Sequence, residues 1–165
     1  MDAAPTSGNE TRHSAPQRQA MRPHPQTTLL ILGILAADQI SKLSASRSGC
    51  GPVICPVRND ALMMGLGAGS QAHVLSFGVI GLAAFALWAR RVARRVDVSW
   101  VAIAAVVAGV AGNLVDRAVL GSVRDFLVIP GVAVINAADV AIAVGLTLIC
   151  VPLYRTILTP TGGNG

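Results

Sequence analysis

Four apolar stretches, separated by short polar segments, dominate the pattern of this chain. They cover residues 27–43, 73–88, 98–115 and 136–153. Each supplies all or most of a helix that crosses the hydrocarbon core of a bilayer, which takes about 20 residues. The pattern therefore predicts an all-α membrane protein with four transmembrane helices, whose short extracytoplasmic loops carry any site.

Both ends of the chain are expected to lie outside this four-helix domain, which we place at residues 27–158. Residues 1–26 are rich in Pro, Ser, Thr, Gln, Arg and His, and they bury too little apolar surface to offset the entropy of ordering them. We expect a disordered cytoplasmic tail there and a flexible tail at residues 159–165. The first apolar stretch also resembles a cleavable signal peptide, but Asp38 and Lys42 behind its apolar core argue against that alternative.

The composition agrees with a chain that lipid largely covers. Hydrophobic residues make up 53% of the 165 positions and charged residues only 13%, which leaves too few polar groups to cover a soluble domain. The net charge of +5 comes from basic residues clustered between apolar runs, so we expect no nucleic acid as a partner. The three cysteines form no zinc-binding pattern, and we expect no metal and no cofactor.

Basic residues near the ends of the spans predict the orientation, because they concentrate on the cytoplasmic side. With the amino terminus inside, the inner side carries Arg12, Arg18, Arg22, Arg90, Arg91, Arg94, Arg95 and Arg155. The outer side then carries Lys42, Arg47, Arg58, Arg117 and Arg124. The larger inner set predicts that both termini are cytoplasmic. The polar residues near the other ends of the spans then face outward together.

Acidic residues in apolar stretches are functional candidates, because an unpaired charge inside a bilayer is strongly unfavourable. Asp38 and Lys42 are four residues apart in the first stretch. Residues at this spacing are neighbours on a helix, so we favour an ion pair within that helix. Such a pair would position the first helix without taking part in chemistry.

Two Asn-x-x-Asp pairs flank the loop between the third and fourth stretches. Asn113 and Asp116 form the first pair, and Asn136 and Asp139 form the second. Residues at this spacing share a helix face, so each amide can lie beside its carboxylate. Helix capping is an alternative for the second pair, which begins a helix. It does not explain the first pair, because an acid at a carboxyl end opposes the helix dipole.

Asp125 and Asp139 are the candidates for catalysis. The loop that contains Asp125 returns toward the membrane, and Asp139 lies in the first turns of the fourth span. Two such carboxylates cannot both ionise easily, so they share a proton and one apparent pKa rises. In an aspartic protease, one carboxylate activates a water and its protonated partner supports the developing oxyanion.

Five segments resemble, in order, the motifs of the lipoprotein signal peptidase family, also called signal peptidase II. They read DQISK at 38–42, NDALMMG at 59–65, GNLVDR at 112–117, VRDF at 123–126 and NAAD at 136–139. The resemblance covers roughly residues 29–155. It implies an intramembrane aspartic endopeptidase of the bacterial inner membrane. Such an enzyme removes the signal peptides of lipid-modified prolipoproteins by cutting before the diacylglyceryl-cysteine.

The resemblance also implies roles for single residues. It makes Asp125 and Asp139 the catalytic pair. The positions it implies for substrate binding or support are Asp38, Lys42, Asn59, Gly65, Asn113, Asp116, Arg117 and Asn136. The expected partners are lipidated prolipoprotein signal peptides and membrane lipids.

This chain departs from the family pattern in two ways. Residues 61–64 read ALMM where the family has Gly, two small residues and Phe. The segments 43–58 and 126–138 are shorter than the resemblance leads us to expect. We therefore expect an altered pocket wall and a reduced substrate clamp.

Two other functions remain open at this stage. One is a proton-coupled carrier of small solutes that uses Asp38, Asp116 and Asp139 as relay acids. The lack of a visible internal repeat argues against it. The other is a non-catalytic homologue that binds lipidated peptides.

The cysteines give a separate expectation. Cys50 and Cys55 lie in an outward loop with a Gly-Pro pair between them, so we hypothesise a disulfide. Cys150 lies within the fourth stretch, and we expect it to be reduced and buried.

Overall fold

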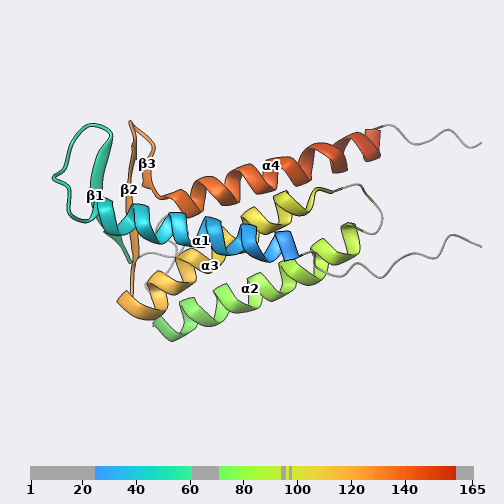
Figure 1. Cartoon of the computed structure of the whole chain (residues 1–165), viewed down its shortest axis with the longest axis horizontal. Helices are drawn as coiled ribbons and strands as arrows, with labels where there is room; N and C mark the ends of the chain where they lie inside the picture. Colours follow the sequence, from blue (N-terminus) through green and yellow to red (C-terminus); the bar gives the residue numbers. More distant parts are fainter. Residues whose placement is uncertain (1–24, 61–70, 94–95, 97, 159–165) are drawn as a thin grey trace, which may run out of the picture.

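A bundle of four helices ends in a small β-sheet at one end (Figure 1). The computed structural model describes residues 25–60, 71–93, 96 and 98–158. Its helices are α1 (Pro25–Ala45), α2 (Gln71–Val92), α3 (Trp100–Leu120) and α4 (Ala137–Leu158). All four contain a segment long and apolar enough to cross a membrane, so the four predicted spans are confirmed.

The helix bounds differ from the sequence pattern by a few residues. Pro25 and Gln26, expected in the tail, form the start of α1, where proline is well tolerated because the first-turn N–H groups have no partner. Ser99 caps α3 by accepting a hydrogen bond from the backbone N–H of Val101. Gly121 ends α3 with a φ of 79°, a left-handed conformation that glycine adopts without strain. The remaining residues of both predicted tails lie outside the described residues.

The sheet at the end of the bundle was not predicted from the sequence. Its strands are β1 (Ile54–Asn59), β2 (Val123–Ile129) and β3 (Ala133–Ile135), paired antiparallel in the order β1-β2-β3. A turn with Gly131 at a φ of 72° joins β2 to β3. The short strands β1 and β2 come from distant loops, so no local pattern indicates that they pair.

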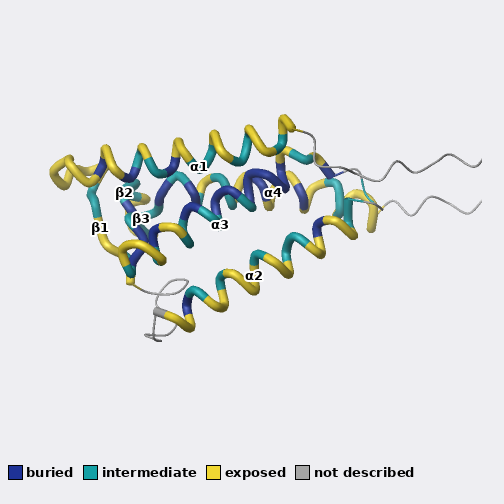
Figure 2. Tube along the Cα trace, turned by 60° about the horizontal axis from the view of Figure 1, so that its bottom comes forward, coloured by how far each residue is buried: buried dark blue, intermediate teal, exposed yellow. Residues whose placement is uncertain are grey.

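Helix α3 lies at the centre of the bundle. It contains the most buried span, with 44% of its apolar window buried against 11–17% for the other three. Small residues allow α4 to pack closely on it: a Cβ added at Gly109 would lie 2.5 Å from the carbonyl oxygen of Ala138. Figure 2 shows long exposed stretches along the outer helices, as expected where lipid replaces water.

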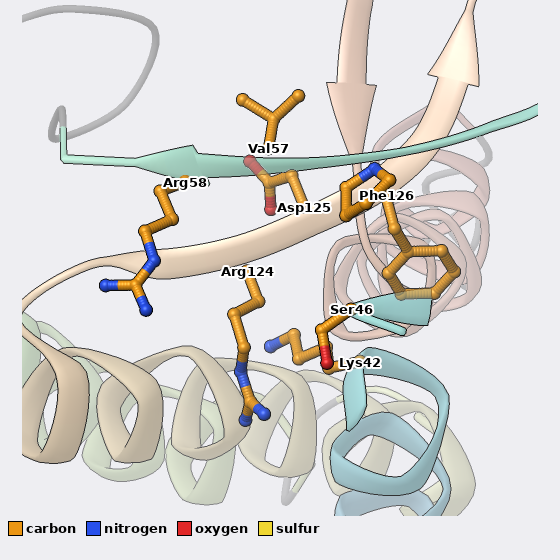
Figure 3. Close-up of a pocket in the computed structure, with 8 residues that line it drawn as sticks. Lys42, Ser46, Val57, Arg58, Arg124, Asp125 and Phe126 are labelled. Carbon is orange, nitrogen blue, oxygen red and sulfur yellow. The ribbon is translucent and has the colours of Figure 1, made fainter. Parts of the chain in front are cut away.

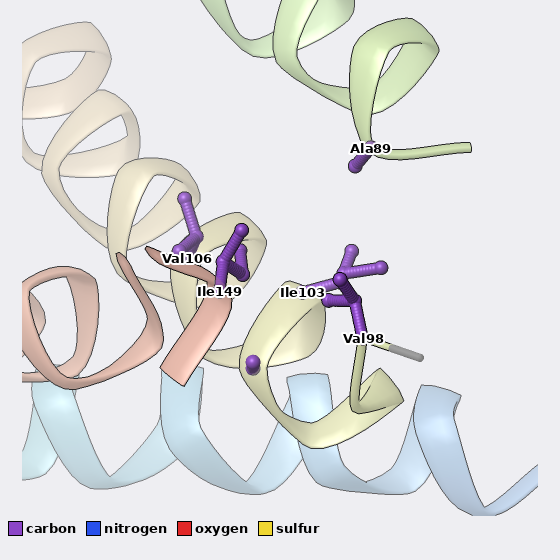
Figure 4. Close-up of a cluster of buried hydrophobic side chains, with 6 residues drawn as sticks. Ala89, Val98, Ile103, Val106 and Ile149 are labelled. Atoms are coloured by element: carbon purple, nitrogen blue, oxygen red, sulfur yellow. The ribbon is translucent and has the colours of Figure 1, made fainter. Parts of the chain in front are cut away.

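A hydrophobic cluster joins three helices at the end of the bundle away from the sheet (Figure 4). It contains Ala89 of α2, Ile149 of α4 and the α3 side chains Ala102, Ile103 and Val106, together with Val98 just before α3. Cys150, the next residue on α4, is a free thiol but it is exposed, so the expectation of a buried side chain was wrong. The apolar character of a span does not reveal which face is turned away from the other helices.

The predicted disulfide is present. Cys50 and Cys55 are joined with a sulfur–sulfur distance of 2.03 Å. Cys50 lies in the segment before β1, and Cys55 lies within β1. The backbone N–H of Gly51 donates to the carbonyl of Ile54, which closes the same short loop. The crosslink therefore restrains the chain as it enters the sheet.

Candidate active site

Lys42 is buried at the carboxyl end of α1 and connects this helix to α3. Its Nζ lies 2.8 Å from Oδ2 of Asp38, so the predicted ion pair within the helix is confirmed. The same nitrogen lies 3.4 Å from Oδ2 of Asp116 and donates to Oδ1 of Asn113 at 2.9 Å. Lys42 therefore has partners on both helices and not only the local pair that the sequence indicated.

Asp38 joins α1 to the amino end of α4. Its Oδ1 accepts the backbone N–H of Ala138 at 2.8 Å, a position where the helix dipole favours a negative group. Gly112 of α3 allows this approach, since a Cβ there would lie 2.6 Å from Oδ2 of Asp38. Asp38 thus holds α1, α3 and α4 in one arrangement at the level of the site.

Arg124 connects β2 to the carboxyl end of α3. Its backbone N–H donates to Oδ2 of Asp116 at 3.0 Å, and its guanidinium donates to both oxygens of that carboxylate, at 2.7 Å and 3.3 Å. The hydrogen bond to Asp116 raises the pKa of the Arg124 guanidinium. A further bond of 2.7 Å runs from Nη2 of Arg124 to Oε1 of Gln39 on α1. Neither Gln39 nor Arg124 was among the residues predicted for the site.

Asp125, the next residue on β2, is buried and held by two asparagines. Nδ2 of Asn59 donates to Oδ2 at 2.9 Å, and Nδ2 of Asn136 donates to Oδ1 at 2.6 Å. Burial raises the pKa of the Asp125 carboxyl above its ordinary value, and the charge of Asp139 acts in the same direction. The two amide hydrogen bonds act against this shift but do not cancel it.

Asp139 lies in the first turn of α4 and is also held by two asparagines. Nδ2 of Asn113 donates to Oδ1 at 2.9 Å, and the backbone N–H of Asn136 donates to Oδ2 at 3.1 Å. In return, the backbone N–H of Asp139 donates to Oδ1 of Asn136 at 3.0 Å, which completes a reciprocal helix cap. The capping alternative is therefore correct for this pair, and Asn136 also contacts Asp125.

The structure brings most of the predicted positions into one polar cluster at the sheet end of the bundle. Its members are Asp38, Lys42, Asn59, Asn113, Asp116, Asp125, Asn136 and Asp139. Arg117 is half-buried in the last turn of α3, where its carbonyl accepts the N–H of Gly121. Gly65 and the altered segment 61–64 lie outside the described residues.

A pocket of about 310 Å³ adjoins this cluster (Figure 3). Its walls come from the end of α1, from β1 and from β2. The residues that line it are Lys42, Ser46, Pro56, Val57, Arg58, Arg124, Asp125 and Phe126. Because Asp125 belongs to this wall, a molecule in the pocket lies beside one of the two candidate catalytic acids.

The geometry suits acid–base chemistry by a pair of carboxylates. Asn136 bridges the pair, since its side chain donates to Asp125 and its backbone donates to Asp139. The raised pKa of Asp125 favours a protonated acid next to an ionisable one. Such a pair can deliver one proton and accept another in the same reaction.

Comparison with known proteins identifies a single family. The model of Signal peptidase (SPase) II, Peptidase_A8, matches residues 30–155. The lipoprotein signal peptidase of Acinetobacter baylyi is 32% identical in an alignment of 143 positions that covers 76% of this chain and 79% of that protein. The lipoprotein signal peptidase of Pseudomonas putida is 33% identical in an alignment of 96 positions that covers 54% of this chain and 56% of that protein. This chain thus spans little more than half the length of the Pseudomonas relative.

Solved structures agree at the level of the fold. A bacterial membrane enzyme determined by the in meso method at 2.3 Å resolution matches with a TM-score of 0.68 and 22% identity. The match covers 86% of this chain and 94% of that one. A second such structure, at 1.9 Å resolution, has a TM-score of 0.65. With the family model covering residues 30–155, the chain belongs to the signal peptidase II family.

Proposed function

We propose that this chain is an intramembrane aspartic endopeptidase that removes the signal peptide from lipid-modified prolipoproteins, cutting before the diacylglyceryl-cysteine. One observation carries the proposal: Asn136 bridges Asp125 and Asp139 at the end of a four-helix membrane bundle. Both acids lie within the part of the chain that the family model matches. The names of the curated relatives supply the class of substrate.

In the proposed mechanism, Asp125 holds the proton that the pair shares, because burial raises its pKa. Asp139 takes a proton from a water whose oxygen attacks the scissile carbonyl, while Asp125 donates its proton to the carbonyl oxygen. The resulting gem-diol collapses as the carbon–nitrogen bond breaks. Asp139 gives its proton to the leaving amine of the lipidated cysteine, and a hydroxyl proton of the diol returns to Asp125. One water is consumed, and the pair ends in its starting state.

The proposed setting is the bacterial inner membrane, with both termini in the cytoplasm and the sheet end outside. The distribution of basic residues along the sequence supports this orientation. The start of α1 and the end of α4 both point away from the sheet, so the described chain enters and leaves the bundle on the side opposite the sheet (Figure 1). Large exposed apolar side chains such as Leu29, Phe77 and Ile157 support lipid contact along the helices.

A cleavage assay tests the proposal. Purified protein in detergent is incubated with a lipidated preprotein and with the same preprotein in unlipidated form. We expect cleavage of the lipidated substrate alone, and the Asp125→Asn variant serves as the inactive control.

The two alternatives give different results. A non-catalytic homologue would bind the lipidated preprotein and leave it intact. A carrier would leave it intact and would instead move a solute in response to a pH gradient across reconstituted vesicles.

A further inference from the structure

Two arginines lie directly opposite each other in the sheet. Arg58 of β1 and Arg124 of β2 are register partners in the antiparallel pair. Like charges in this position destabilise a sheet, because their side chains project from the same face within a few ångströms of each other. Such a pair becomes favourable when a negative group binds between or beside the two cations.

Both arginines line the 310 Å³ pocket next to Asp125. Figure 3 shows their side chains extending from the two strands toward the same side, with Lys42 of α1 nearby. Three cationic side chains thus contribute to one pocket. Among the described residues that line it, Asp125 is the only acid, and burial raises its pKa, so it supplies less negative charge than an ordinary aspartate.

The two arginines differ in how they are held. Arg124 is fixed by Asp116 and Gln39, and Lys42 is paired with Asp38 and Asp116. Arg58 is exposed and forms no ion pair or side-chain hydrogen bond with any residue in 25–60, 71–93, 96 or 98–158. Within the described part of the chain, the pocket therefore has one guanidinium held by partners and one that these residues leave without a polar partner. A planar guanidinium matches a carboxylate with two parallel hydrogen bonds.

We propose that Arg58, with Arg124 fixed opposite it, forms a subsite for an acidic side chain of the substrate peptide close to the scissile bond. This inference rests on the proposed function. Asp125 also lines the pocket, and its carboxylate points away from the Arg124 guanidinium, so an occupant beside the arginines lies next to the strand that carries one of the two candidate catalytic acids (Figure 3). A phospholipid headgroup has a suitable charge as well, but at this position it would compete with the peptide for the space beside Asp125.

A substrate scan tests the subsite. Lipidated preproteins are made with a single Glu at successive positions on either side of the modified cysteine, each matched by a Gln version. At one position the wild type should cleave the Glu substrate with a kcat/KM roughly five- to tenfold above that of its Gln partner, as expected for a partly exposed charge-assisted hydrogen bond.

Variants of Arg58 should change this preference. Arg58→Gln should cleave the two substrates equally, and Arg58→Lys should keep part of the preference. Arg58→Glu should instead prefer a Lys at the same position. Arg47→Gln is the matched control, because Arg47 is exposed in the segment between α1 and β1 but does not line the pocket. It should retain the wild-type preference for Glu.

The outcomes separate this subsite from the proposed function. Equal cleavage of every Glu and Gln pair by the wild type overturns the subsite and leaves the peptidase assignment standing. A preference that Arg58→Gln retains also overturns it. If the rate shows no Glu preference but depends on both Arg58 and added phosphatidylglycerol, the pocket belongs to a headgroup and the subsite is wrong. A wild type that cleaves no lipidated substrate overturns the function and the subsite together.

Discussion

The side-chain amide of Asn136 donates a hydrogen bond of 2.6 Å to the carboxylate of Asp125, a contact that joins the start of α4 to β2. The same residue caps α4 through its reciprocal bonds with Asp139. One residue therefore begins a membrane helix and sets the relative position of both candidate catalytic acids. The stability of the helix start and the geometry of the site are coupled through it.

Substitution of Asn136 tests its contacts with both acids. Asn136→Asp keeps a good capping group but removes the amide donor to Asp125 and buries a third carboxyl beside the pair. We expect a large loss of turnover and a lower thermal stability, and the stability should recover toward acidic pH as the added carboxyl is protonated. Asn136→Ala should lose turnover and also about 1 kcal/mol of stability through the missing cap. Thermal unfolding in detergent and the cleavage assay measure the two effects. Full turnover in Asn136→Asp would contradict the bridging role.

Asp125 and Asp139 should behave as a single unit. Asp125→Asn and Asp139→Asn keep the size of the side chain but abolish the shared proton, so each should lower turnover by roughly 10³-fold or more. The double variant should be hardly worse than either single one, because groups that act together are not additive. Insertion and folding are checked by size-exclusion chromatography. Near wild-type turnover in Asp125→Asn would exclude this pair and direct attention to Asp116 with Asp139.

Asp38 and Lys42 should affect stability more than chemistry. Lys42→Met leaves the buried carboxylates of Asp38 and Asp116 without this cation, and breaking a buried pair in this way costs about 3–5 kcal/mol. Asp116 retains Arg124, so we expect a value at the lower end. Asp38→Asn should also lower the melting temperature, since it weakens the contacts to Lys42 and to α4.

The control for these two variants is Ser46→Ala, which removes an exposed hydroxyl from the residue that follows α1. It should change the free energy of unfolding by less than about 0.5 kcal/mol. If Lys42→Met were as stable as the control, the buried network would not hold α1 to α3.

The sequence predicted the features that follow from local pattern. Apolar length predicted the four spans correctly. The spacing of the two Asn-x-x-Asp pairs predicted that each amide lies beside its own carboxylate, and this was wrong, because the side-chain amide of Asn136 donates to Asp125 and that of Asn113 donates to Asp139. The hydrogen bond between Gln39 and Arg124 could not be predicted in this way, because it joins residues 85 positions apart. The sheet could not be predicted either, since β1 and β2 come from distant loops. The exposure of Cys150 was not predicted for a different reason. An apolar helix face can contact either lipid or another helix, and hydropathy does not distinguish these two environments.

The disulfide should matter for the position of β1. Cys50→Ser with Cys55→Ser releases the loop that leads into this strand, and Asn59 at its end donates to Asp125. A crosslink over so short a loop stabilises by at most about 2 kcal/mol, so the protein should stay folded. We expect a lower melting temperature and a modest loss of turnover. The matched control is Cys150→Ser, whose thiol forms no disulfide, and mass spectrometry with and without reductant verifies the crosslink.

Asp125 should make the folded protein less stable as the pH rises. Its pKa in the folded state is raised above the ordinary value of an aspartate, chiefly by burial. The folded state therefore holds this proton more tightly than the unfolded state does. The contribution of Asp125 to the free energy of unfolding is most favourable below its pKa in the unfolded state. This contribution is lost as the pH rises through its pKa in the folded state. Asp125→Asn should be inactive, and it cannot lose a proton, so its stability relative to the wild type should rise with pH. Its side chain has one acceptor oxygen where Asp125 has two, so the substitution also weakens one of the bonds from Asn59 and Asn136 at every pH.

Melting temperatures of both proteins in detergent, measured from about pH 4 to pH 8, test this sign. The difference between Asp125→Asn and the wild type should be smallest at the acidic end and should grow with pH. Asn59→Ala supplies the comparison, because it removes a hydrogen bond that opposes the raised pKa of Asp125 and should enlarge the effect. If the wild type instead gained stability over Asp125→Asn as the pH rose, the carboxylate would be the favoured form, and Asp125 would be the base of the pair rather than its acid.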